Sequence, residues 1–221
     1  MRMELDGLSE DGFAVLRTTD SRDLLKLAEK IGVLRRRSSG RSFIDELKPQ
    51  PADHARTSSM TSRFGIRAFP FHTDGAFLRV PPRFTLLRCE SDSVGQRPTF
   101  VLDSKKFLAP TLCERLVRHI WQVSVRPSFY CSLLQQREDG FCLRWDPNII
   151  KAAHKAAQAT TVEFTNAIES AASTAIIWQP SVTLVLDNWR VLHARADRPH
   201  GIEHEDRLLQ RVYVDPLKER S

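Results

Sequence analysis

The chain has 221 residues, of which 41% are hydrophobic and 27% charged, and this composition is typical of one globular domain. A fibrous or disordered chain is excluded, because nine Gly and twelve Pro are scattered without period and the apolar content supports a packed core. No apolar stretch approaches the roughly 20 residues of a membrane span. The acidic segment 1–11 lacks the basic start and apolar centre of a signal peptide. We therefore expect a single cytoplasmic domain over 1–221.

The net charge of +6 comes from arginine, since the chain has 25 Arg against 8 Lys. Basic patches bind phosphate groups, so this balance raises the question of nucleic acid. The arginines are spread along the chain, and the short cluster Arg35–Arg37 has neither interleaved aromatic residues nor a helix-turn-helix pattern beside it. The charge pattern therefore does not favour nucleic-acid binding.

The four cysteines lie far apart and form no C-x-x-C pair, so neither a zinc knuckle nor a redox dithiol is predicted. They are Cys89, Cys113, Cys131 and Cys142. We expect them to be reduced and mostly buried.

The N-terminal part carries a strand signal, a helix signal and then a long polar stretch. A short apolar run at 11–16 follows a turn signal and predicts a strand. Residues 21–32 predict a helix, with Ser21 able to cap its start and Gly32 able to end it. Residues 35–67 are polar, and a loop of this length inside a compact domain is typical of a functional lid or a mobile segment.

The rest of the chain mixes short strands with two further helices. The predicted helices are 110–119 and 160–173, the second one extended by the alanine-rich 151–159. The predicted strands lie within 69–102, in a hairpin over 123–145 with its turn at 138–140, and at 175–178, 182–186 and 208–214. Many short strands with few, irregularly placed helices favour a mainly β fold with flanking helices, a barrel or double-sheet jelly roll, over a doubly wound α/β sheet.

The sharpest local signal is Phe-His-Thr-Asp-Gly at 71–75. In a strand, residues two apart point to the same side, so His72 and Asp74 can present an imidazole and a carboxylate to one point. This tripeptide alone is weak, and a surface His beside a turn Asp is the ordinary alternative. His193, which follows the apolar run 182–186, offers a third ligand. Two histidines and one carboxylate suit a non-heme Fe(II) oxygenase, because they leave three coordination positions open.

Several further pieces occur in an order and spacing that together are fairly specific. They are the Asp-Gly-Phe-Ala-Val-Leu opening at 11–16, Phe71–Ala76, Pro82–Cys89, Thr99, Asp187–Arg195 and Arg207–Arg211. In these pieces the sequence resembles the taurine dioxygenase-like family of Fe(II)/2-oxoglutarate oxygenases, which is related to clavaminate synthase. The resemblance implies a double-stranded β-helix, the cupin-like jelly roll, in which His72, Asp74 and His193 bind Fe(II).

The same resemblance assigns residues to the cosubstrate and the substrate. Thr99 follows Asp74 by 25 positions and Arg207 follows His193 by 14, within the family's spacing for the hydroxyl and guanidinium that hold the distal carboxylate of 2-oxoglutarate. A guanidinium binds a carboxylate through two parallel charge-assisted hydrogen bonds. Arg211 is assigned to an acidic group of the primary substrate. Three alternatives stay open. Thr99 could be an ordinary strand threonine, Arg207 could be a solvated arginine whose role Arg211 takes, and Arg211 could pair with an acidic neighbour.

Only 93 residues separate Thr99 from His193, where longer members of the family carry insertions that help to cover the active site. We therefore expect the substrate pocket to be built mainly from 35–67, as an active-site loop or lid, and from 123–145.

The resemblance implies a dioxygenase that uses Fe(II), 2-oxoglutarate and O2 to hydroxylate an unactivated C–H bond, with succinate and CO2 as co-products. The expected substrate is a small polar, carboxylate-bearing molecule such as an amino acid or a derivative. Desaturation or cyclisation with the same cofactors, or a non-catalytic jelly-roll binding module, are the alternatives. Asn188 is either a group that orients a metal ligand or a turn asparagine. The remaining histidines are interpreted as non-ligands: His54, His119, His154, His200 and His204.

Overall fold

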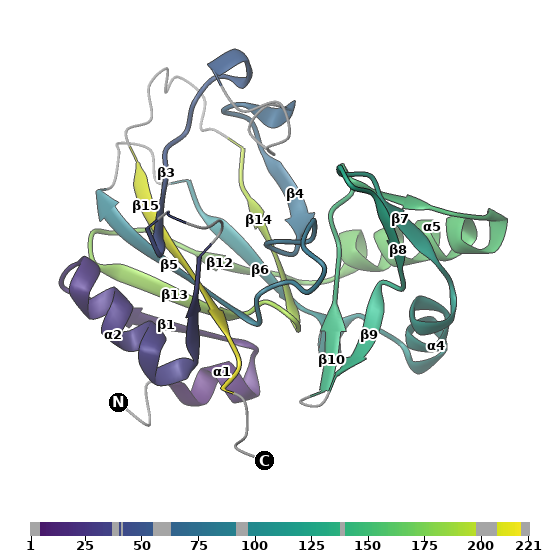
Figure 1. Cartoon of the computed structure of the whole chain (residues 1–221), viewed down its shortest axis with the longest axis horizontal. Coiled ribbons are helices and arrows are strands. Elements are labelled where there is room, and N and C mark those ends of the chain that lie inside the picture. The colour runs from purple at the N-terminus through teal and green to yellow at the C-terminus, as the bar shows by residue number, and fades with distance from the viewer. Residues whose placement is uncertain are drawn as a thin grey trace.

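The computed structural model describes residues 5–36, 40, 42–54, 63–91, 97–137, 140–197 and 207–217, which form two lobes (Figure 1). The helices are α1 (Asp6–Glu10), α2 (Ser21–Ile31), α4 (Pro110–Arg118) and α5 (Lys155–Ser170), with short 3-10 turns η2 (Ala52–His54) and η3 (Ser104–Lys106). The strands of the N-terminal half are β1 (Phe13–Arg17), β2 (Val33–Arg35), β3 (Ile44–Leu47), β4 (Phe69–His72), β5 (Phe84–Ser91) and β6 (Thr99–Asp103). Those of the other half are β7 (Trp121–Val123), β8 (Phe129–Cys131), β9 (Leu134–Arg137), β10 (Gly140–Leu143), β11 (Ile150–Ala152), β12 (Thr174–Ile176), β13 (Val182–Asp187), β14 (Val191–Arg195) and β15 (Leu208–Asp215).

Two sheets packed face to face form the larger lobe. One has the order β1-β13-β5-β15-β2, with β3 also paired to β15, and the other has the order β12-β6-β14-β4. The core between them joins Leu87 and Leu184 of the first sheet to Val101 and Val191 of the second. In both sheets, neighbouring strands are far apart in the sequence, and this connectivity is typical of a jelly roll. The predicted mainly β fold, a double-stranded β-helix, is confirmed.

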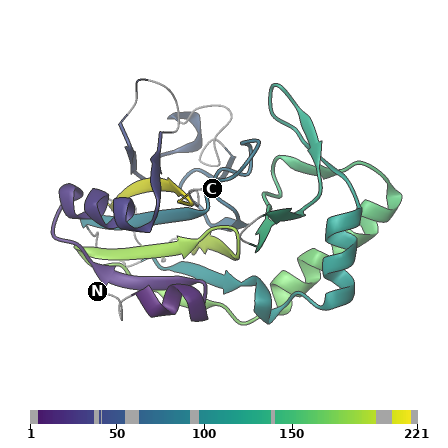
Figure 2. The same cartoon turned by 60° about the horizontal axis from the view of Figure 1, so that its bottom comes forward.

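Helix α2 covers the outer face of the first sheet (Figure 2). Its buried residues Leu24, Leu27 and Ala28 pack with side chains of β5, β13 and β15. The helix predicted at 21–32 is confirmed, but its N-cap is Asp20, whose carboxylate accepts hydrogen bonds from the next turn's amides, and not Ser21. Ser21 is the first helical residue, and its hydroxyl bonds to the side chain of Gln210.

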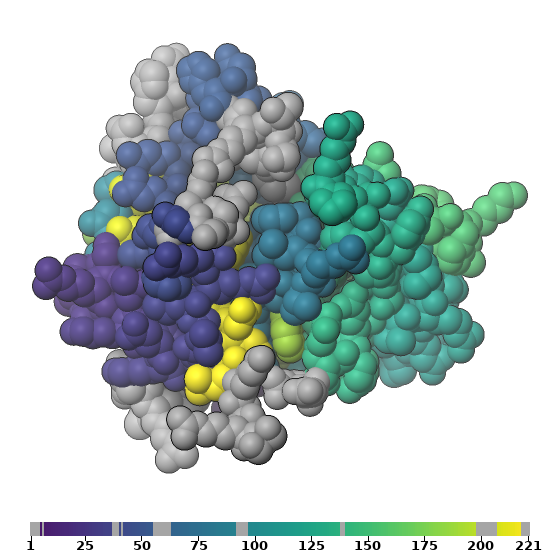
Figure 3. All heavy atoms as spheres, viewed as in Figure 1, coloured from purple at the N-terminus to yellow at the C-terminus, as the bar shows by residue number. Residues whose placement is uncertain are grey.

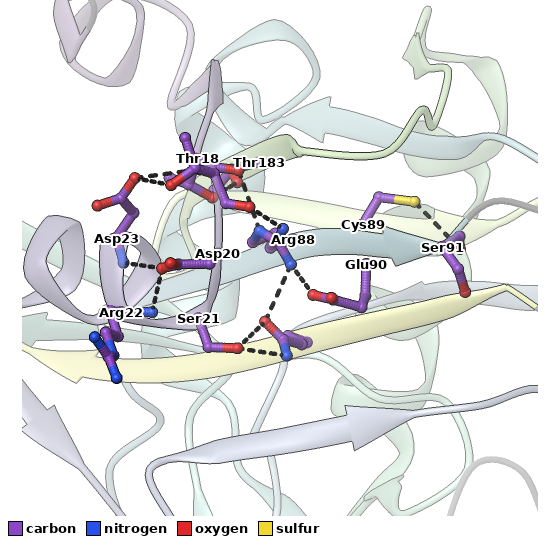
Figure 4. A network of polar contacts seen from close by, with 12 residues as sticks. Thr18, Asp20, Ser21, Arg22, Asp23, Arg88, Cys89, Glu90, Ser91 and Thr183 are labelled. Carbon is purple, nitrogen blue, oxygen red and sulfur yellow. Dashed lines mark hydrogen bonds and ion pairs between the residues drawn. The ribbon is translucent and has the colours of Figure 1, made fainter.

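A buried polar network joins the start of α2 to this sheet (Figure 4). Arg88 donates to the carbonyls of Thr18 and Thr19 and to the side chain of Gln210. Beside it the hydroxyls of Thr18 and Thr183 lie 2.7 Å apart. Since buried polar groups are costly unless they are paired, these contacts fix the turn between β1 and α2.

The second lobe consists of α4, β7 to β11 and α5 and packs on the outer face of the four-stranded sheet. Its core combines Trp121, Trp145 and Phe164 with Leu102 and Leu192, which belong to β6 and β14. Strands β11, β7 and β8 form a small sheet, and β9 pairs with β10. In the space-filling view the segment that follows β4 lies between the two lobes (Figure 3). His72, at the end of β4, and Asp74, just after it, therefore lie where the lobes meet.

Three predicted elements of the second lobe can be compared with the structure. The hairpin within 123–145 is present as β9 and β10, and residues 138–139 of its turn lie outside the described part. Helix α4 confirms the helix predicted at 110–119. The extension of the next helix over 151–159 is wrong for its first residues, because Ile150–Ala152 pairs with Trp121–Val123 as a strand. The helix begins at Lys155, with the His154 ring accepting a hydrogen bond from the Ala157 amide.

The segment 35–67 is less irregular than its polar sequence predicts. It contains β3, which pairs with β15, and the turn η2, while residues 37–39, 41 and 55–62 lie outside the described part. In β3 the inward-facing position 45 carries a charged residue, so the strand lacks the apolar alternation by which strands are recognised.

All four cysteines are free thiols, with Cys89 and Cys142 buried and the other two partly buried. Burial raises the pKa of the Cys142 thiol to about 12. No helix in the described ranges is long and apolar enough to cross a membrane.

Candidate metal centre

His72, Asp74 and His193, called the triad below, are buried and lie close together. His72 ends β4 and lies directly opposite His193 of β14 in the strand register, with ring centroids 4.3 Å apart. Asp74 follows in a tight turn in which Gly75 has φ +68°, and a Cβ at Gly75 would lie 2.7 Å from Pro82 Cδ. Glycine is therefore required for the turn that aims Asp74 back at the two rings.

The ligand atoms of the triad converge on one point. One ring nitrogen from each histidine and one carboxylate oxygen all lie within 4.8 Å of one another, and Asp74 Oδ2 is 3.9 Å from His193 Nε2. His72 Nδ1 lies 2.9 Å from the Pro70 carbonyl. Donation to that carbonyl leaves His72 Nε2 with its lone pair toward the centre. No other group of three metal-binding side chains occurs in the described ranges.

The carboxylate of Asp74 is divided between two environments. Its Oδ1 accepts a 3.0 Å hydrogen bond from Arg211 Nη1, whereas Oδ2 is buried and has no hydrogen-bond partner in the described part of the chain. Buried oxygen atoms are normally paired, so an orphaned one aimed at two imidazoles suits a cation. Two histidines and one carboxylate on one face, with further positions open, fit a non-heme Fe(II) ion.

The electrostatics favour the protonation state that metal binding needs. Burial acts to raise the pKa of the Asp74 carboxyl, and the Arg211 guanidinium is the largest influence that lowers it. The two histidines and the Tyr213 side chain lower it further, which holds this pKa below its usual value. Burial, together with neighbouring His72, lowers the pKa of His193 to about 3. At neutral pH the centre therefore holds a carboxylate and a neutral imidazole, as metal ligation requires.

Asn188 holds the backbone on both sides of the Asp74 side chain. Its Oδ1 accepts from the Asp74 amide at 2.9 Å, and its Nδ2 donates to the carbonyls of Asp74 and Pro82, each at 2.9 Å. The residue is 1% exposed, so these three hydrogen bonds use both ends of the amide in a dry environment. Of the two interpretations of Asn188, its contacts favour the group that orients a ligand.

Thr99 and Arg207 are both buried, and a hydrogen bond joins Arg207 to the chain two residues before Thr99. Thr99 of β6 is two residues from Val101, the register partner of His193, and its hydroxyl accepts a 3.0 Å hydrogen bond from Trp178 Nε1. Arg207 is 4% exposed and donates from Nη1 to the carbonyl of Arg97, two residues before Thr99, at 2.6 Å. Both side chains are buried, as the predicted pair of a hydroxyl and a guanidinium requires.

Arg211 lies on the inner face of β15, between two carboxylates. Its Nη1 is 3.0 Å from Asp74 Oδ1 and its Nη2 is 3.1 Å from Asp45 Oδ2 on the neighbouring strand β3. Arg211 thus pairs with acidic neighbours, which was one of the alternatives left open by the sequence. Asp45 is a site residue that the sequence did not indicate, because its partner is 166 positions away and β3 has no strand-like pattern.

Comparisons with known proteins agree with this geometry. The family model described as "Taurine catabolism dioxygenase TauD, TfdA family" matches residues 3–108, which include His72, Asp74 and Thr99. An asparagine oxygenase structure, in complex with Fe(II), 3-hydroxyasparagine and succinate, superposes with TM-score 0.74 at 18% identity over 96% of this chain and 78% of that chain. The non-heme iron oxygenase OrfP with Fe and alpha-ketoglutaric acid gives TM-score 0.71 at 15% identity, covering 97% of this chain and 78% of that one.

The PvcB protein from Pseudomonas aeruginosa matches with TM-score 0.67 at 20% identity, over 97% of this chain and 80% of that chain. At such identities the solved structures show a shared fold, and the family model adds the sequence relation. Residues 3–108 of the chain match the model of the TauD/TfdA family of dioxygenases, and the chain shares its fold with these non-heme iron oxygenases.

Proposed function

We propose that this protein is an Fe(II)- and 2-oxoglutarate-dependent dioxygenase that hydroxylates an unactivated C–H bond of a small, carboxylate-bearing substrate, an amino acid or a derivative. The observation that carries the proposal is the triad, with its orphaned Asp74 Oδ2 facing His193 at 3.9 Å inside a TauD-like fold. When bound, Fe(II) together with 2-oxoglutarate and O2 supplies the oxidation, and the cosubstrate leaves as succinate and CO2.

The metal would be held by His72 Nε2, His193 Nε2 and Asp74 Oδ2. The distal carboxylate of 2-oxoglutarate would bind the Arg207 guanidinium and the Thr99 hydroxyl, both of which are buried. A buried guanidinium is suited to this task, because a charge-assisted pair is strengthened where water is excluded. The contribution of these five residues is to orient the reactants and to keep water away.

The substrate class follows from the charges beside the metal ligands. Arg211 and Asp45 present a cation and an anion 3.1 Å apart, and this spacing suits the carboxylate and ammonium groups of an amino acid. Both side chains are only partly buried, with 12% and 20% of their surface exposed, so a small molecule can reach them. The asparagine oxygenase structure, which holds 3-hydroxyasparagine, supports an amino-acid substrate by analogy.

The substrate would be covered from two sides. The loop 35–67 contributes Asp45 through β3, and the segment 123–145 ends at Trp145, next to the metal-binding turn. A single domain over 1–221 would then contain the whole site. Its four free thiols suit the reducing cytoplasm, where we place the protein.

The test is turnover by the purified protein with Fe(II), ascorbate, 2-oxoglutarate and air. Succinate should form and should form faster with one member of an amino-acid panel, whose product gains the mass of one oxygen atom. Loss of two hydrogen atoms instead would mean desaturation or cyclisation by the same site. The His72→Ala variant is the negative control.

Two results would contradict the proposal at different levels. If no succinate forms with or without candidate substrates, the dioxygenase assignment fails. If the carboxamide analogues of the amino acids react as well as the acids, the carboxylate-bearing substrate class fails while the enzyme class stands.

A further inference from the structure

We infer that Thr73, the residue between the first two metal ligands, is a positioning residue through which the second lobe fixes the metal centre. The inference rests on the proposed metal site and adds a role that the triad itself does not have. Thr73 is 2% exposed, and neither its sequence context nor its chemistry suggests a ligand. Its importance comes from what its hydroxyl and amide contact.

The polar groups of Thr73 face away from the triad and toward the exit of the β9–β10 hairpin. His72 and Asp74 approach His193 and Arg211 on the inner side. The Thr73 hydroxyl instead contacts the backbone of Leu143 and Trp145, whose side chains belong to the core of the second lobe. One three-residue segment therefore has two ligands on one side and a lobe contact on the other.

Three hydrogen bonds make this contact. The Thr73 hydroxyl donates to the Leu143 carbonyl at 3.2 Å and accepts from the Trp145 amide at 3.1 Å, while the Thr73 amide donates to the Trp145 carbonyl at 2.7 Å. The hydroxyl thus uses its donor and an acceptor position at once, in a buried position. A side chain without a hydroxyl would leave a carbonyl and an amide of the hairpin exit unpaired.

Residues 143–145, at the end of the β9–β10 hairpin, also contact the other chain segments of the metal centre. The Leu143 amide donates to the Trp189 carbonyl at 2.8 Å, four residues before His193. Arg144, which is fully buried, donates to the carbonyls of Ala76, Leu78 and Arg79 in the turn after Asp74. Residues 143–145 therefore contact both chain segments that carry the ligands.

The physical consequence is that metal affinity should depend on this segment. A tight site requires its ligand atoms to be held in place before the ion arrives, and groups that orient ligands typically contribute 10- to 100-fold in affinity. Among the residues of 143–145 and their partners, Thr73 is the best one to vary, since its contribution is a single hydroxyl that can be removed with little change in volume.

The experiment is an anaerobic titration with Co(II) of a graded series, Thr73→Ser, Thr73→Cys and Thr73→Val, followed by visible absorption. The serine variant keeps the hydroxyl and should bind like the unaltered chain. The valine variant should bind about 10- to 100-fold more weakly and with an altered absorption spectrum. The cysteine variant, a weak donor and acceptor, should lie between them.

The matched control is Thr183→Val. Thr183 is equally buried and bonds through its hydroxyl to Thr18, but it lies on the outer face of the first sheet beneath α2 (Figure 4). Its valine variant should lose stability, measured by urea unfolding, without any change in Co(II) affinity. This separates a general loss of a buried hydrogen bond from a loss of ligand positioning.

The outcomes are distinct. If the unaltered chain binds no Co(II), or binds it as well with His72→Ala, the metal site of the proposed function fails. If the unaltered chain binds and Thr73→Val binds equally well with the same spectrum, only the positioning role fails. If Thr73→Val does not fold, the comparison of the serine and cysteine variants decides, and equal affinities for these two would overturn the inference.

Discussion

Arg211 should contribute strongly to the stability of the protein, because it is the cation shared by the buried carboxylate of Asp74 and the partly buried carboxylate of Asp45. Its guanidinium lies 3.0 Å from Asp74 and 3.1 Å from Asp45, at 12% exposure. Removing one partner from a buried ion pair typically costs about 3 to 5 kcal/mol, since a charge is left without compensation. The Arg211→Met substitution, which keeps much of the side chain's volume, should lower the free energy of unfolding by this amount. The melting temperature should then fall by about 6 to 20 °C.

Urea unfolding of the metal-free protein measures this change. Arg17→Met is the matched control, because Arg17 is exposed and its hydrogen bonds to Pro180 and Gln179 are 3.4 and 3.2 Å long, and it should change stability by less than about 0.5 kcal/mol. Adding Asp45→Asn to Arg211→Met should recover part of the loss, because one of the two uncompensated carboxylates is removed. A loss below about 1 kcal/mol for Arg211→Met would refute the reasoning, since exposed pairs contribute only that much.

Three further outcomes are expected. Alanine at each position of the triad should abolish Co(II) binding and 2-oxoglutarate turnover while far-UV circular dichroism stays unchanged, and a variant that remains active would remove that residue from the site. Arg207→Ala should raise the KM for 2-oxoglutarate by about 10- to 100-fold, the equivalent of one lost charge-assisted hydrogen bond, and far more than Arg211→Ala does; the reverse order would exchange their roles. Burial and the nearby His154 hold the pKa of His119 below 6.5, so neutral His119 favours the fold, and stability should fall as the pH drops below about 6.5. His119→Gln should reduce that pH dependence in urea unfolding, while the part that comes from buried His193 remains, and an unchanged profile would contradict the prediction.

The parts of this protein that the sequence predicts are those written in local patterns. The spacing of His72 and Asp74 in a strand, with His193 after another, predicts three ligands on one face, and the structure brings their ligand atoms within 4.8 Å of one another. Helix α2 is predicted for the same reason, because its apolar side and its boundaries lie within eleven consecutive residues.

The parts that the sequence hides depend on partners far along the chain. Residues 150–152 belong to an alanine-rich helical signal, yet they form β11 because Trp121–Val123 offers a free strand edge in the second lobe. Asp45 has the appearance of a loop residue, and only the pairing of β3 with β15 places it opposite Arg211. Thr73 is hidden for another reason, since its contacts at 143–145 are made to backbone atoms, which no residue pattern can encode.

If Arg211 binds the substrate as proposed, its ion pairs also restrict which molecules can enter the site. A simple carboxylate that takes a position on Arg211 must displace or share Asp45, and a partly buried carboxylate then loses its cation. An amino acid avoids that penalty, because its ammonium group replaces the guanidinium beside Asp45 while its carboxylate replaces Asp45 beside Arg211. The number of compensated charges is the same before and after binding, so the contact that stabilises the ligand-free chain becomes a means of rejecting acids without an amine. Asp45→Asn should therefore lower this discrimination. The measurement is the ratio of turnover of an amino acid to turnover of the same acid without its amine, and an unchanged ratio in the variant would contradict the argument.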